Sequence, residues 1–273
     1  MTSLADVPAV PTRPAPPSRA VRARDVLVSE WTKLRSVRST FWTLLIAGAT
    51  AIGGSAVVAI STATSPRTAG LPFDPVASVY VAWLEYPVLA VGILGALSFT
   101  SEYASGLVRT TFASVPRRVA VLAAKASVTG AVVLAFGEVV AFASFLLSAA
   151  ILSGRHSDLS LSRAGEARAV LAGGFCLFVV ALVGLGLGAI TRHTAGAVAA
   201  LPAVVYLPLV VLSLPSPWND DVGRFTLLVA AYQLVSGHPQ AGLLSVPLSF
   251  LVLVAWPAVI LVTGGVFLTR RDA

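Results

Sequence analysis

The chain has 273 residues, of which 56% are hydrophobic and only 11% charged, and its mean hydropathy is +0.87. A soluble domain of this size carries about 25% charged residues, so this composition cannot cover a water-soluble globule. Disorder is excluded because most of the chain is apolar enough to demand burial. A single cysteine excludes an internal disulfide framework. The composition is that of an integral membrane protein with several spans.

The N-terminal part of the chain divides into two segments ahead of the first long apolar run. Residues 1–20 are rich in proline and have no apolar core, which predicts a disordered cytosolic tail and no cleavable signal peptide. Residues 21–38 carry too many charges to insert into a bilayer, but Leu27, Trp31 and Leu34 recur at i, i+4 and i+7. This stripe predicts an amphipathic helix in the membrane interface. The helix either anchors the first span or also docks a cytosolic partner.

Long apolar runs fill the rest of the chain, residues 39–273. A helix crosses the hydrocarbon core with roughly 20 apolar residues, and runs that are continuous rather than alternating exclude a β-barrel. The predicted fold class is therefore all-α: a polytopic membrane protein with six transmembrane helices, an N-terminal interfacial helix and a short cytosolic coupling helix. We expect spans near residues 41–61, 77–99, 126–152, 169–190, 195–214 and 246–268.

The distribution of Lys and Arg predicts the orientation of these spans. With the N-terminus in the cytosol, the inner segments hold 14 of these residues and the outer segments hold 5. This bias places both termini inside, in a multi-pass protein of the plasma membrane. The basic isoelectric point then reflects orientation and contact with anionic membrane lipids, and no nucleic-acid partner is expected.

Two segments between the spans carry further information. Residues 100–118 have apolar residues at helical spacing and end near Pro116, which lacks an amide donor and stops a helix. This short helix could transmit a push from a soluble partner, or it could be a plain basic inner loop. Residues 222–235 are apolar but too short to span, which predicts a half-buried or re-entrant helix at the outer face. An external gate is the alternative there.

Four segments, in this order, carry a resemblance: SEWTKLRSVRSTFWTLL (29–45), SEYASGLVRTTFASVPRRVAVLAAK (101–125), ITRHTAGAVAALP (190–202) and FLTRRDA (267–273). Together with the six-span spacing, they resemble the membrane subunit of a type-2 ABC exporter, especially the small six-helix permeases of actinobacterial type. The second segment is similar to the family's E-Y-x-x-G-x-x-R-T…P-R-R…K loop between spans two and three.

The resemblance implies a coupling loop that rests on a separate ATP-binding subunit, present in two copies. It also implies a second permease chain, either an identical copy or a close relative. The positions that match the family's loop, and that are therefore expected to couple ATP hydrolysis to transport, are Glu102, Gly106, Arg109, Thr110, Pro116 and Arg117. The short segment between spans five and six leaves no room for a folded extracellular domain.

The chain itself shows no catalytic motif. It contains no Gly-Lys pair of a phosphate-binding loop, and its glycine cluster at Gly184, Gly186 and Gly188 suits close helix packing. The three histidines are scattered over both sides of the membrane, so no metal site is expected, and there is no nucleophile elbow. We expect no catalytic residue, no cofactor and no enzyme activity, with ATP hydrolysed on another polypeptide.

Two acids fall within the predicted spans: Glu85 in the second and Glu138 in the third. Each is either a contact in the translocation path or a protonated side chain bonded to a neighbour. The sequence thus favours the permease subunit of an ATP-driven exporter for a small amphipathic or lipid-like substrate. The alternatives are a secondary transporter with Glu85 and Glu138 as proton carriers, and a membrane scaffold that transports nothing.

Overall fold

The computed structural model describes residues 23–64, 76, 80, 83, 86–115, 117–153, 159–216, 218–238, 240 and 242–270. Within these ranges every long regular element is a helix. The elements are α1 (Ala23–Ser36), α2 (Arg38–Thr64), α4 (Tyr86–Ala104), α5 (Leu107–Ser114), α6 (Arg118–Leu152), α7 (Ala164–Thr191), α8 (Thr194–Val211), α9 (Trp218–Asp221), the 3-10 helix η3 (Gly223–Phe225), α10 (Leu227–Val235) and α11 (Val246–Arg270). The tail predicted at 1–20 lies outside the described residues.

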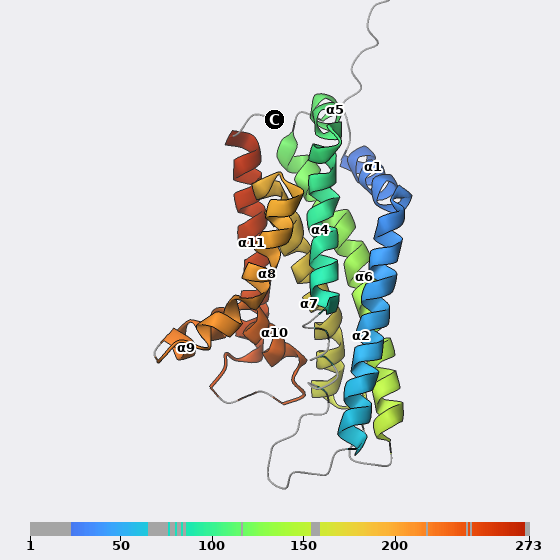
Figure 1. Ribbon diagram of the computed structural model, residues 1–273, viewed down its shortest axis with the longest axis vertical. Helices are drawn as coiled ribbons and strands as arrows, with labels where there is room; N and C mark the ends of the chain where they lie inside the picture. Colours follow the sequence, from blue (N-terminus) through green and yellow to red (C-terminus); the bar gives the residue numbers. More distant parts are fainter. Residues whose placement is uncertain are drawn as a thin grey trace, which may run out of the picture.

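Six of these helices, α2, α4, α6, α7, α8 and α11, are long and apolar enough to cross a membrane. The prediction of an all-helical protein with six such helices is confirmed. Figure 1 shows the long helices running side by side, with α1, α5 and the C-terminal end of α11 gathered at one end of the bundle. We refer to that end as the α5 end.

The helix boundaries near the α5 end differ from those expected. The helix predicted to end at 99 continues to Ala104, and the helix predicted to begin at 126 already begins at Arg118. The prediction stopped each span where charges begin, but Glu102 and Lys125 pair with each other inside the protein. Paired charges cost less to bury, so the helices extend further.

Helix α7 is the centre of the bundle. Inside the protein, 78% of its most apolar stretch is buried, against 28% for α2 and for α8. Its glycines let the neighbouring backbones approach closely: a Cβ at Gly184 would lie 1.9 Å from the carbonyl oxygen of Gly92 on α4. Likewise, a Cβ at Gly95 would lie 2.0 Å from the carbonyl oxygen of Ala181. Small residues therefore set the distance between α4 and α7.

At the opposite end, the segment predicted at 222–235 forms η3 and α10. The buried face of α10, which includes Leu227, Ala230 and Leu234, packs against α7 and α11. Arg168 of α7 donates hydrogen bonds to the carbonyl oxygens of Leu234 and Ser236, which satisfies the C-terminal end of α10. This short helix is therefore an integral part of the bundle.

The close packing of α4 on α7 makes a prediction. Gly184→Ala places a methyl group against the Gly92 carbonyl and should force the two helices apart, at a cost of about 3 kcal/mol in the free energy of unfolding. Gly53→Ala on α2 is the matched control, because a Cβ there meets nothing within 4 Å. Thermal unfolding in detergent measures the stability of both variants. Equal stability of the two would contradict the packing described here.

Candidate functional site

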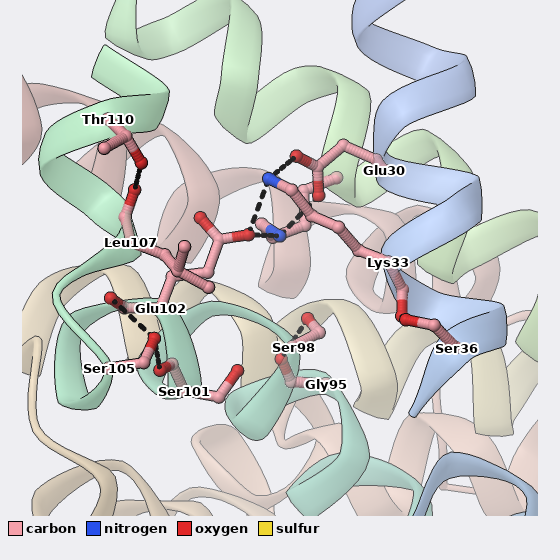
Figure 2. Close-up of polar contacts among 11 residues, drawn as sticks. Glu30, Lys33, Ser36, Gly95, Ser98, Ser101, Glu102, Ser105, Leu107 and Thr110 are labelled. Atoms are coloured by element: carbon pink, nitrogen blue, oxygen red, sulfur yellow. Dashed lines mark hydrogen bonds and ion pairs between the residues drawn. The ribbon is translucent and has the colours of Figure 1, made fainter. Parts of the chain in front are cut away.

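Four charged side chains meet at the α5 end. They are Glu30 and Lys33 of α1, Glu102 in the last turn of α4, and Lys125 near the start of α6, and we call them the ionic quartet. Lys33 Nζ lies 2.8 Å from Glu30 Oε1 and 2.9 Å from Glu102 Oε1. Lys125 Nζ lies 2.5 Å from Glu30 Oε2 and 2.8 Å from Glu102 Oε1. Figure 2 shows Glu30 and Lys33 of α1 pointing toward Glu102 of α4.

The quartet is mostly withdrawn from solvent. Glu30 and Lys125 are each 4% exposed and Glu102 is 8% exposed, whereas the Lys33 side chain keeps 35% of its surface open. Burial lowers the pKa of Lys33, but its hydrogen bonds to Glu30 and Glu102 outweigh that effect and hold the pKa above its usual value. Two ammonium and two carboxylate groups balance, so four charges, three of them buried, are neutralised in one place.

The two faces of α1 explain how this helix sits on the bundle. Val26 and Glu30, four residues apart, are its buried residues. Leu27 and Trp31 remain 38% and 48% exposed, on the side away from the protein, and Leu34 is half-buried. Helix α1 therefore packs on the bundle through its ionic face. The apolar stripe predicted as a membrane anchor stays available for another contact.

The predicted coupling positions divide into a buried and an exposed group. Glu102 belongs to the ionic quartet, while Thr110 and Arg117 are exposed. Gly106 precedes α5 with a φ of 74°, a left-handed conformation that favours glycine and that turns the chain sharply between α4 and α5. Pro116 and the side chain of Arg109 lie outside the described part of the structure.

Two arginines tie the end of α11 to the rest of the α5 end. Arg118 donates to the carbonyl oxygen of Leu268 at 2.9 Å, and Arg192 donates to that of Phe267 at 2.8 Å. Both cations thus satisfy carbonyls in the last turn of a helix, where positive charge is favoured. The Arg118 guanidinium also lies over the Phe112 ring of α5, 5.4 Å from its centroid. Helix α5 is in this way connected to α6 and α11.

A pocket of about 430 Å³ opens beside the ionic quartet. It lies between the junction of α1 with α2, the second half of α4 and the first turns of α6. Apolar side chains such as Leu94, Leu97 and Val128 line one part of it, and all four members of the ionic quartet line another. Several serine and threonine residues complete the wall.

The two acids predicted within the spans have different outcomes. Glu138 lies near the middle of α6, against α7, where a Cβ at Gly174 would be 2.6 Å from the Glu138 Cδ. Its Oε2 is buried without a hydrogen-bond partner among the described residues. Glu85 lies outside those residues, so its placement in the translocation path stays a prediction.

Sequence reasoning missed Glu30 and the role of the two lysines. Lys33 and Lys125, the only lysines of the chain, were interpreted as part of the inner positive charge, and Glu30 received no role. A usable signal existed in the i, i+3 spacing of Glu30 and Lys33. Their partners Glu102 and Lys125 are far away in the sequence, and only the fold brings them together.

No group of three or more metal-ligating side chains occurs among the residues described. No protein-family model matches the sequence, and no curated protein matches it either.

The ionic quartet makes a stability prediction. Lys125→Met removes the buried cation and leaves Glu30 and Glu102 with only the partly exposed Lys33 between them, and it should cost about 3–5 kcal/mol in the free energy of unfolding. Lys33→Met should cost less, because the Lys33 side chain is 35% exposed. The double variant Lys125→Met/Glu30→Gln removes one charge of each sign and should recover part of the loss. Denaturation in detergent checks this, and a Lys125→Met protein as stable as Lys33→Met would refute it.

Proposed function

We propose that the chain is the permease subunit of an ABC exporter of the type-2 class, driven by ATP hydrolysed on a separate subunit. The observation that carries the proposal is the ionic quartet. It joins α1 to the last turn of α4 and the start of α6, directly beside α5. A force applied to α1 or α5 would therefore reach two of the long apolar helices through bonded side chains.

Helix α5 has the form of a coupling element. Val108 is buried and Phe112 lies beneath Arg118, while Leu107 is 54% exposed and Thr110 is exposed. One side of the helix is thus fixed to the bundle, and the other is open to a soluble partner. The exposed Leu107 offers the apolar contact that a protein interface needs at its centre.

The remaining parts of the proposal come from the sequence. The resemblance to type-2 exporters supplies the separate ATP-binding subunits, two per assembly, and the absence of a Gly-Lys phosphate-binding motif in the given sequence is consistent with them. The bias of 14 inner against 5 outer basic residues supports an orientation with the α5 end in the cytosol, in a protein that we propose to lie in the plasma membrane. The weakly buried helices α2 and α8 leave apolar faces for lipid and for a second permease chain. The apolar walls favour a small amphipathic or lipid-like substrate.

A second candidate is a proton-coupled secondary transporter. The buried, unpartnered Oε2 of Glu138 favours it, because an acid in that position is most stable when protonated and could carry a proton. Under this alternative, Glu138→Gln abolishes transport and the purified chain works alone in a proton gradient. Under our proposal, transport requires ATP and the partner subunit.

Arg117 and Arg163 form a matched pair for testing the coupling surface. Each is an arginine directly before a long helix, Arg117 before α6 at the α5 end and Arg163 before α7 at the opposite end. We expect a protein with Walker motifs to co-purify with the chain from its native membrane. In that complex, Arg117→Gln should lower transport-coupled ATP turnover by about tenfold, since charged interface contacts of this kind control association.

Arg163 pairs with Glu166 at 3.1 Å, so Arg163→Gln removes a contact at the end opposite to the coupling surface, and it should leave ATP turnover within about twofold of the wild type. Each variant complex is reconstituted in vesicles, and its substrate efflux and phosphate release are recorded together. Proton-driven transport by the chain alone would overturn the proposal, and so would equal effects of the two arginine substitutions.

A further inference from the structure

We propose that the pocket beside the ionic quartet binds an uncharged amphiphile whose head group both donates and accepts hydrogen bonds. In the setting of the proposed exporter, this is the class of its substrate, and only that last step rests on the proposed function. The volume of about 430 Å³ falls within the range of about 300–1,000 Å³ typical of small-molecule sites.

The wall of the pocket has an apolar part and a hydroxyl-bearing part. Leu94 and Leu97 of α4 and Val128 of α6 form the apolar part, which suits a hydrocarbon body. The hydroxyls of Thr43 and Ser101 also face this space, and neither has a hydrogen-bond partner among the described residues. Hydroxyl groups that no protein atom satisfies are available to a polar ligand.

The ionic quartet supplies the most polar contacts. Lys33 Nζ donates to Glu30 and Glu102, which leaves one N–H of its ammonium without a partner in the described part of the chain. Glu102 Oε1 accepts from both lysines, whereas its Oε2 accepts no bond from the described residues. Among the same residues Lys125 Nζ likewise donates only to Glu30 and Glu102, so the quartet offers the pocket the third N–H of each lysine as a donor and Glu102 Oε2 as an acceptor.

The charge of the quartet selects the head group. Two lysines and two glutamates cancel, so an ionised head group in the pocket would find no excess charge of opposite sign. An ion that loses part of its hydration in the pocket and gains no counter-ion there is disfavoured. A head group that donates and accepts without carrying charge, such as the hydroxyls of a polyol or sugar, matches the site. A carboxylate, phosphate or ammonium does not.

The position of the pocket also fits an amphiphile. Its lining includes Leu107, Ser39 and Ser101, all of which are exposed. Phe41 and Trp42, 63% and 58% exposed, stand in the same first turn of α2. Exposed aromatic residues at the end of an apolar helix mark the level of the lipid head groups. An amphiphile in the membrane holds its head group at that level, next to the polar part of the pocket, and its chain at the depth of the apolar part.

The test uses three photoreactive probes with the same short acyl or alkyl chain: an uncharged monoacylglycerol, a fatty acid and an alkylammonium. The full-length chain is reconstituted in nanodiscs without any ATP-binding subunit, cross-linked, digested and mapped by mass spectrometry. We expect the monoacylglycerol to label residues 94–105 and 125–129 at least about tenfold more than the charged probes. Equal labelling by all three probes would overturn the proposal.

A pair of leucine substitutions tests the site directly. Leu97→Trp fills the pocket and should reduce labelling of residues 94–105 by about tenfold, because the larger side chain occupies the space that the ligand needs. Leu146→Trp on the same bundle is the control, because Leu146 is 58% exposed and distant in sequence from the pocket residues of α6. Thermal unfolding verifies that both variants are folded. Undiminished labelling of Leu97→Trp would place the ligand elsewhere.

Charge variants of the quartet should change which of the three probes is preferred. A quartet that only stabilises the fold would leave that preference unchanged. Lys33→Gln leaves one excess negative charge and should shift the preference to the alkylammonium, while Glu102→Gln should shift it to the fatty acid. The double variant Lys33→Gln/Glu102→Gln is neutral and should return to the uncharged probe. An unchanged preference in the folded single variants refutes the proposal. Because no ATPase is present, failure of the exporter proposal would leave these binding results intact, and the reverse also holds.

Discussion

The architecture of the α5 end depends on one constraint: four charges in a largely apolar protein have to meet. Glu30, Lys125 and Glu102 are almost fully buried, and none of them would be tolerated there without the others. Their contacts hold together three helices that are distant in the chain, α1, α4 and α6. Hydrophobic packing alone would leave α1 free to slide, because its exposed apolar stripe faces away from the bundle.

The same arrangement produces both functional features proposed above. Helix α5 follows the end of α4 that the quartet fixes, and the stacking of Arg118 on Phe112 fixes its inner side. Movement of α5 is therefore tied to movement of α4 and α6. The four quartet side chains also line the pocket, so a change in their contacts would alter the pocket at the same time. Coupling and binding would in that case be linked through four side chains.

The sequence was sufficient for the six long helices, because an apolar run of bilayer length has few stable solutions other than a helix. It also anticipated the glycine contacts of α7, whose cause is the small size of Gly184 and its neighbours. The extension of α4 to Ala104 and the early start of α6 were not predicted. The free-energy cost of burying Glu102 and Lys125 depends on their charged partners, which only the fold brings close. Glu30 was missed for the same reason.

Hydrogen–deuterium exchange of the purified wild type and of Lys125→Met tests most directly whether the quartet holds the α5 end together. The account predicts faster exchange in Lys125→Met across both α1 and residues 100–114, with exchange in α10 unchanged, because α10 is bound to the opposite end by Arg168. Unchanged exchange in α1, with loss of protection elsewhere or nowhere, would contradict it.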